Sequence, residues 1–431
     1  MKIRLLALAI AGTTFAGTAV AAPFAPFDVR AAGMGGTGVA SAKSASAALF
    51  NPAMLSTQVE GDKFQFLLGV GGQFTDSGDL LDGVDDLQTT LDDFDLLIDR
   101  IDNENIAYGT YSSTLAETGS LTATLSNQFS AINGAKATVL PGAALGVGVP
   151  GKNLGVGVFV GANGLVSISP TIDAADTNRL NRYAGIMADG VVDATDYTNN
   201  PDLFKDPITT GGQVELEDFN SQSTVTAVGV LVGEVGIALS RELVLENGGL
   251  LSLGVTPKML DITTYEYTAN TEGFDDADIE NFETTDSGFD IDVGAVYKMS
   301  ADAQWQYGVV VKNLIGGSYS TKPNIGTPRK IDLDPQLRAG VARMTNRTTL
   351  AADLDITKNT GTTGGDSTQF LALGAEYDLK YLQLRAGYRA NLASSSVGDV
   401  MTAGIGLGPV DLTAVVGDDT VGAFLQLGFG W

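Results

Sequence analysis

The feature that most constrains this chain is a strand-like alternation that recurs in segments of about ten residues. From Leu154 to Ala162 every second residue is apolar, and three of the four residues between them are glycine. The same alternation runs through 289–297, with Asp290 and Asp292 on the opposite face, and through 350–356. Such a pattern is typical of a membrane-spanning strand with one face toward lipid.

Fourteen segments share this pattern, and the links between them indicate how they are arranged. The segments are 63–74, 140–149, 154–169, 223–240, 249–265, 287–299, 303–313, 335–345, 348–358, 367–378, 381–391, 399–408, 410–416 and 420–431. Most links alternate between long loops and tight turns, although 241–248 and 417–419 fit less well. A soluble sandwich also alternates, but an even-stranded barrel with both termini in the periplasm requires this succession of links. We therefore expect an all-β fold, a transmembrane antiparallel β-barrel over residues 62–431.

The N-terminus predicts export. Lys2 and Arg4 precede an apolar run, and small residues surround Ala21, so residues 1–21 match a secretory signal peptide. No later stretch has about 18 uninterrupted apolar residues, which argues against a helical inner-membrane protein. The expected location is the outer membrane of a Gram-negative bacterium, where the strands contact outer-membrane lipid.

A glycine-rich stretch precedes the first strand and is neither a regular helix nor a strand. It contains Gly33, Met34, Gly35, Gly36 and Gly38, then small residues, and ends at Asn51 and Pro52. Glycines allow tight turns and close approach of backbones, and Asn-Pro ends the preceding segment. We expect residues 22–61 to fold inside the barrel as a hatch, which either moves for a solute or only seals the lumen.

The composition argues against several classes of function. The chain has no cysteine and no histidine, so it lacks the thiol nucleophile, the usual general base and the commonest metal ligand. A net charge of −26 argues against binding nucleic acid. Residues 275–280 lack the glycine and the ligand spacing of a calcium loop. We expect no enzymatic activity, no cofactor and no dedicated metal site.

The long links carry the negative charge. Residues 75–139, 170–222 and 266–286 hold 12, 10 and 8 of the 51 carboxylates. They form either a solvated surface or an acidic binding surface.

Within the first link, residues 76–139, a heptad stripe followed by a weaker helical pattern predicts an antiparallel helical hairpin outside the barrel. The stripe comprises Leu80, Val84, Leu87, Leu91, Phe94, Ile98 and Ile101. Either the two apolar faces bury each other, or they leave a groove for a protein partner or an apolar ligand.

Charged residues of the later strands fall on the face opposite the lipid. This set comprises Arg338, Asp353, Asp355, Glu376, Asp378, Arg385 and Arg389. We expect a lumenal ladder of cross-strand ion pairs, which either stiffens the wall or binds the polar head of a solute.

The stretches 33–40 and 51–53, followed by fourteen strands, resemble the FadL-type outer-membrane transporters. Residues 384–391 and 402–408, with the last strand, are similar to the barrel-type conjugal-transfer TraF proteins. The resemblance implies a lumenal hatch and passive uptake of hydrophobic or amphipathic small molecules. The acidic hairpin departs from the fatty-acid transporter pattern and argues against carboxylate-bearing cargo.

Two hypotheses follow from the sequence. In the first, the chain is a hatch-plugged channel for hydrophobic solutes. In the second, the barrel anchors the hairpin and acidic loops for contact with a protein partner at the cell surface or in conjugal transfer.

Overall fold

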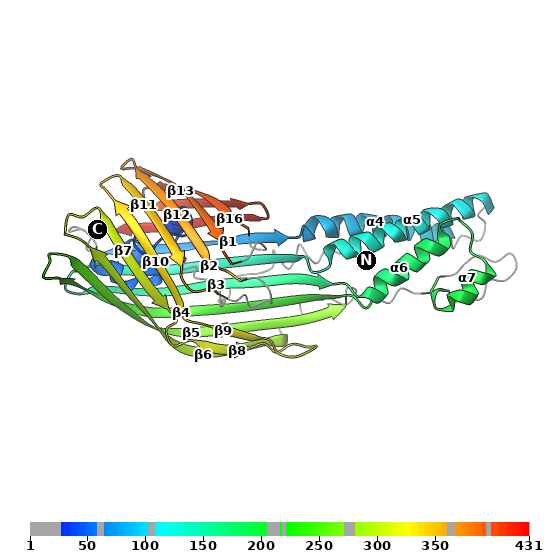
Figure 1. Cartoon of the computed structure of the whole chain (residues 1–431), viewed down its shortest axis with the longest axis horizontal. Helices are drawn as coiled ribbons and strands as arrows, with labels where there is room; N and C mark the ends of the chain where they lie inside the picture. Colours follow the sequence, from blue (N-terminus) through cyan, green and yellow to red (C-terminus); the bar gives the residue numbers. More distant parts are fainter. Residues whose placement is uncertain are drawn as a thin grey trace.

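The chain forms a closed antiparallel barrel of fourteen strands, with helices extending from one end (Figure 1). The computed structural model describes residues 27–57, 64–101, 108–204, 216–217, 221–270, 281–359, 367–393 and 398–430. The wall strands are β1 (Gln65–Ser77), β2 (Lys136–Val149), β3 (Gly155–Thr171), β4 (Thr224–Val244), β5 (Leu250–Asn270), β6 (Glu283–Lys298), β7 (Trp305–Lys312), β10 (Gln336–Met344), β11 (Thr348–Asp355), β12 (Phe370–Asp378), β13 (Leu382–Asn391), β14 (Val400–Leu407), β15 (Val410–Gly417) and β16 (Thr420–Gly430). Strand β1 pairs with both β2 and β16, which closes the wall.

The fourteen predicted strands are confirmed, with shifted ends. The largest shift is in β5, which ends at Asn270 rather than at residue 265. Six short connections lie at one end of the barrel, which we call the turn end, and the long links lie at the other, the loop end. Strand β4 continues to Val244, so the link predicted at 241–248 is a turn over 245–249 at the turn end. The short link after β15 is at the loop end.

The wall has an uneven height. Strands β4 and β5 have 21 residues each, whereas β7, β11, β14 and β15 have 8 each. At roughly 3.3 Å per residue the long strands extend far beyond the short ones. Figure 1 shows the long strands β1–β5 running toward the helices and the short strands β10–β13 ending well before them.

Alternate side chains of the wall face outward and inward, as the sequence predicts. On β3, Val160 is 48% exposed, whereas Phe159 is fully buried in the lumen. The outward residues form an apolar surface suited to lipid.

Residues 27–57, which we call the lumenal segment, lie inside the barrel. They form two short helices, α2 (Val29–Ala32) and α3 (Ser44–Phe50), and a 3-10 helix, η1 (Pro52–Ser56). Nearly every side chain is buried, and the apolar ones share a core with inward residues of the wall such as Leu67, Ala144 and Val310. The predicted hatch residues lie in this segment. The structure does not describe residues 22–26 and 58–61 of the predicted hatch, nor the signal peptide 1–21, the acidic run 275–280 and Trp431.

The first link forms the predicted helical hairpin, α4 (Leu80–Ile101) and α5 (Tyr108–Ile132). The second link adds two helices that the sequence analysis did not predict, α6 (Ala174–Met187) and α7 (Ala194–Asn199), and a short 3-10 helix over Pro201–Leu203. Helix α6 packs along α5, so the hairpin is part of a three-helix unit (Figure 1). Among the described residues, no helix is both long and apolar enough to cross a membrane.

A further hairpin, absent from the sequence prediction, lies between β7 and β10. Its strands are β8 (Gly317–Ser320) and β9 (Lys330–Leu333), which among the described strands pair only with each other. Four residues per strand are too few to produce a detectable alternation.

Candidate functional site: the plugged lumen

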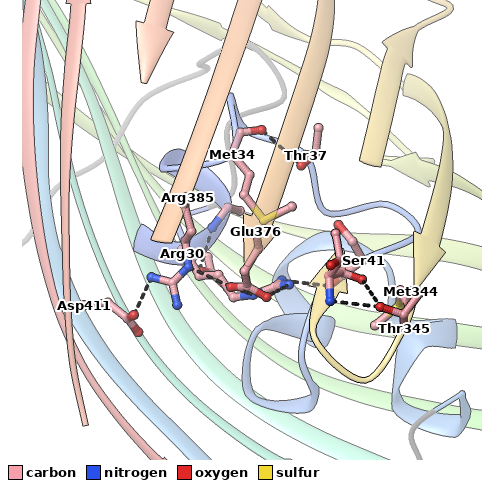
Figure 2. Close-up of polar contacts among 12 residues, drawn as sticks. Arg30, Met34, Thr37, Ser41, Met344, Thr345, Glu376, Arg385 and Asp411 are labelled. Carbon is pink, nitrogen blue, oxygen red and sulfur yellow. Dashed lines mark hydrogen bonds and ion pairs between the residues drawn. The ribbon is translucent and has the colours of Figure 1, made fainter. Parts of the chain in front are cut away.

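An ion-pair chain anchors the N-terminal part of the lumenal segment to the wall. Arg30 on α2 donates from Nε and Nη2 to the two carboxylate oxygens of Glu376 on β12, both at 2.8 Å. Arg385 on β13 donates to the same carboxylate at 2.7 Å and continues the chain to Asp411 on β15. Figure 2 shows these side chains converging between the segment and the wall. Because Arg30 and Glu376 are both buried, their pairing is needed to compensate lost hydration.

A second anchor involves Asp353 on β11. Its Oδ2 accepts hydrogen bonds from the backbone N–H groups of Gly38 at 2.8 Å and Val39 at 3.0 Å. Its Oδ1 is buried and has no hydrogen-bond partner among the described residues. Asp353 therefore binds the backbone of the plug, a contact that the predicted ladder did not include.

Two lysines of the wall hold backbone carbonyl groups of the segment. Lys312 donates to the carbonyl of Leu49 at 3.0 Å, and Lys298 donates to that of Thr57 at 3.0 Å. The side chain of Asn51 donates to the carbonyl of Val39 at 2.9 Å within the segment and accepts from the N–H of Ala53. Asn51 thus fixes the corner between α3 and η1, in agreement with the turn that the sequence predicts there.

Glycines of the wall allow the segment to approach the strands closely. A Cβ atom at Gly148 would lie 2.1 Å from the carbonyl oxygen of Ser44, and one at Gly387 would lie 2.1 Å from the nitrogen of Gly35. A Cβ atom at Gly254 would lie 2.4 Å from the nitrogen of Ala53. Side chains at these positions would displace the plug. The alternating glycines of the wall therefore form the surface on which residues 27–57 pack, a role that was not predicted from the sequence.

The glycines of the segment itself also have defined roles. Gly35 and Gly36 adopt φ of 72° and 90°, a region that favours glycine. Gly38 has no space for a Cβ because the ring of Phe50 lies against it.

A buried charge cluster on the opposite side of the wall was missed. Lys258 on β5 donates to Glu234 on β4 at 2.8 Å and lies 3.0 Å from Asp292 on β6. Lys312 on β7 lies 3.6 Å from the same Asp292. The sequence offered one signal: inward positions of adjacent strands carry charges of opposite sign.

This cluster also turns the chain into the lumen. Asp292 accepts the N–H of Asn313 at 2.9 Å, and Asp290 accepts the N–H groups of Ile315 and Gly316. Asn313 has a φ of 54°, which ends β7 and redirects the chain.

The β8–β9 hairpin then covers the inner face of the tall strands. Leu333 and Tyr319 pack against Leu260 and Ile262 on the inward face of β5. Glu266 anchors the hairpin by accepting from Arg329 at 2.6 Å. The hairpin therefore conceals an apolar inner surface at the loop end.

The predicted charge ladder divides into separate groups. Arg338 pairs with Asp355 across β10 and β11. Arg389 donates to Gln73 at 2.8 Å, and its guanidinium lies 4.8 Å from the ring centroid of Phe370, so it does not extend the series of ion pairs. Asp378 accepts the N–H of Lys380 at the turn end.

The predicted stripe of α4 is in the interior of the helical unit. Leu80, Leu87 and Ile101 are buried, while the other four members are partly buried. They pack against residues of α5 and α6 such as Leu125, Phe129 and Leu180. The stripe therefore serves packing, and the groove alternative finds no support in these contacts.

The second face of α5 consists of Thr114, Thr118, Thr122 and Ser126, all buried. Each threonine hydroxyl donates to the carbonyl four residues earlier, which satisfies it without a partner helix. Together with Gly119, these small residues allow α6 to pack closely against α5. Because this face of α5 is polar in sequence, the apolar pattern did not reveal the contact with α6. Within the described residues there is no group of three or more side chains suited to a metal ion.

The closed fourteen-stranded wall with an N-terminal segment in its lumen is a fold that this chain shares with a solved transport barrel. The toluene transporter TbuX of Ralstonia pickettii has the same fold, with a TM-score of 0.50 and 11% identity, over 95% of this chain and 99% of that one. A toluene transporter TodX of Pseudomonas putida gives 0.47 and 11%, over 95% and 99%. A FadL homologue of Pseudomonas aeruginosa gives 0.46 and 12%, over 95% and 98%.

Within this class the sequence itself identifies the family. Residues 48–355 match the model of the family described as F plasmid transfer operon, TraF, protein. The chain belongs to this TraF family. The comparison with curated proteins finds no match.

Proposed function

We propose that this protein is an outer-membrane channel for passive uptake of hydrophobic or amphipathic small molecules, closed at rest by residues 27–57. The turn end would face the periplasm and the loop end the outside. The observation that carries the proposal is that the lumenal segment fills the barrel but is attached at discrete polar anchors, Arg30 to Glu376 and Asp353 to Gly38.

The apolar inner surface at the loop end would receive such a solute when the β8–β9 hairpin that covers it moves aside. Leu260, Ile262 and Leu333 lie together where the tall strands meet the β8–β9 hairpin. An apolar molecule gains free energy by leaving water for such a surface, about 25 cal/mol per Å². The fold shared with a toluene transporter supports this class of cargo.

The test is single-channel conductance in planar bilayers. A variant in which a short Gly-Ser linker replaces residues 27–57 should form an open pore, whereas the intact chain should remain closed most of the time. The control replaces residues 80–132 of the helical hairpin with a Gly-Ser turn and should stay closed. Equal conductance of the plug variant and the intact chain would contradict the proposal.

A second candidate function is presentation of the helical unit to a protein partner. It is favoured by the projection of α4, α5 and α6 from the loop end (Figure 1) and by the acidic exposed face of α4. The control variant lacking residues 80–132 also tests it. If the variant loses partner binding but keeps solute uptake, the barrel is a channel and the helical unit binds a partner. If it loses uptake but keeps partner binding, the helical unit takes part in transport.

A further inference from the structure

Aromatic and basic side chains form a band on the outside of the barrel at the turn end, which we call the interfacial belt. Its members are Trp305, Arg343, Arg347, Tyr377, Lys380 and Tyr381. They come from β7, β10, β12 and the turns at 345–347 and 379–381. None of them takes part in the anchors of the lumenal segment.

The alternation of the wall fixes their outward direction. Gln306 and Ala342 are buried against the lumenal segment, so their neighbours Trp305 and Arg343 point outward and lie opposite each other across β7 and β10. On β12, Glu376 faces the lumen, and Tyr377 beside it is 45% exposed on the outside.

Two cations of the belt have uncharged side-chain neighbours in the described part of the chain. Arg343 donates to the side-chain oxygen of Gln304 at 2.9 Å, and the Lys380 ammonium lies 5.2 Å from the ring centroid of Tyr381. In the part of the chain that the structure describes, Arg343, Arg347 and Lys380 form no ion pair with a carboxylate. The loop end, by contrast, carries most of the carboxylates of the long links.

This combination matches the chemistry of a lipid headgroup layer. Tyrosine and tryptophan rings favour the boundary between hydrocarbon and water, and Arg and Lys donate charge-assisted hydrogen bonds to phosphate oxygens. Each cation near an anionic lipid surface favours binding by roughly fivefold. A zwitterionic headgroup would leave part of this attraction unused.

We propose that the interfacial belt binds anionic phospholipid headgroups of the leaflet that surrounds the turn end. The inference rests on the membrane location included in the proposed function, but it does not depend on solute uptake. The belt would fix the depth of the short strands β7, β10 and β12 in the bilayer, because these strands have only 8 or 9 residues.

The test measures which lipids stay bound to the purified full chain. The protein is equilibrated in detergent with equal amounts of phosphatidylglycerol and phosphatidylethanolamine, and the lipids retained are counted by native mass spectrometry. The intact chain should retain phosphatidylglycerol in at least about fivefold excess. The triple variant Arg343→Gln, Arg347→Gln, Lys380→Gln should retain the two lipids about equally.

A matched control removes three cations at the loop end, Arg100→Gln, Lys322→Gln and Lys330→Gln, and should keep the preference. Heat-modifiable gel migration verifies that each variant is folded. Equal retention by the intact chain, or an unchanged preference in the triple variant, would overturn the proposal. If the triple variant does not fold, the lipid preference of the intact chain is measured at about 0.05 M and 0.5 M NaCl. Salt screens the attraction between the cations and anionic headgroups, so an equal preference at both concentrations would overturn the proposal. Loss of lipid preference with intact uptake would leave the proposed function standing.

Discussion

Arg30 on α2 and Glu376 on β12 form a bidentate ion pair, although 346 residues separate them in the sequence. Both side chains are buried, and Glu376 also accepts from Arg385. The pair joins the plug to a chain of charges that runs through three wall strands. Its integrity should therefore control both stability and closure.

Replacing Glu376 with glutamine should loosen the plug. The change removes the carboxylate that pairs directly with buried Arg30, which costs about 3 kcal/mol. We expect more frequent channel openings in planar bilayers and unfolding at lower denaturant concentration. Asp202→Asn is the control, since its pair with Arg182 is solvent-exposed and worth at most about 1 kcal/mol. A closed, fully stable Glu376→Gln variant would exclude the anchor role.

Adding a methyl group to the wall glycines should also displace the plug. Gly148→Ala and Gly387→Ala place a Cβ 2.1 Å from backbone atoms of the segment, so the backbones must separate at a cost of about 1–3 kcal/mol or more. Gly161→Ala and Gly233→Ala are matched controls, because their nearest neighbours would be 3.5 and 3.6 Å away. Conductance should rise only in the first pair. Identical behaviour of all four would show that the close approach is unimportant.

A disulfide can test whether the end of the lumenal segment moves. The hydroxyls of Ser56 in η1 and Ser240 on β4 are in hydrogen-bond contact, and the chain has no cysteine that could interfere. Oxidised Ser56→Cys/Ser240→Cys should block solute uptake, and reductant should restore it. Thr138→Cys/Ser167→Cys links two wall strands and should have no effect. Normal uptake by the oxidised protein would show that this end of the segment stays fixed.

The helical unit offers a pair of glycine substitutions with opposite expected signs. A Cβ at Gly119 would lie 3.0 Å from the Cβ of Met187, so Gly119→Ala should separate α5 from α6 and destabilise them. Gly185 on α6 has open space around its Cβ position, so Gly185→Ala should stabilise the helix by about 0.5–1 kcal/mol. Protease sensitivity of residues 108–187 measures both effects. A stabilising Gly119→Ala would contradict the tight packing.

Acid should release the start of α6. Burial alone would raise the pKa of Asp176, but hydrogen bonds from Ser223, Gln222 and Ser221 hold the pKa below its usual value. A lowered folded-state pKa gives stability that is present above the unfolded value of about 3.9 and is lost as the pH falls through the folded-state value. The protection of the α6 amides from hydrogen exchange, relative to their intrinsic rate at the same pH, should therefore fall below about pH 4.

Asp176→Asn is the control for this acid effect. It should show weaker protection of α6 already at pH 7 and little further change in acid, because it has no charge to lose. A fall in protection of equal size in the variant in acid would assign the effect to another group.

The wall and the first helix were predictable because their signals are local. Alternation places each strand residue on one of two faces, and the heptad of α4 places its stripe on one side, so neither depends on distant partners. The same alternation predicts that Asp353 and Arg389 face the lumen. Their partners were not predictable, because the backbone of Gly38 and the side chain of Gln73 reach them only through the closure of the barrel.

Other features were not predicted, because their residues depart from the rule that apolar side chains mark buried surfaces. Thr118 and Thr122 are polar yet buried, since their hydroxyls bond to their own helix. The wall glycines of 148 and 387 look like neutral spacers until the backbone that they accommodate is known. The β8–β9 hairpin was missed because strands of four residues are too short to show alternation, and α6 because it packs on the small polar face of α5.

The long sequence separation between the lumenal segment and its anchors has a consequence for the order of assembly. Arg30 can meet Glu376 only after β12 is in place, and Phe27 packs against Phe424 of β16, the strand that closes the wall against β1. Contacts between such distant residues form late, because ordering the chain between them costs entropy. We therefore expect the final strand to complete the cylinder and seat the plug in one event, so that a nascent barrel does not pass through a closed but unplugged stage.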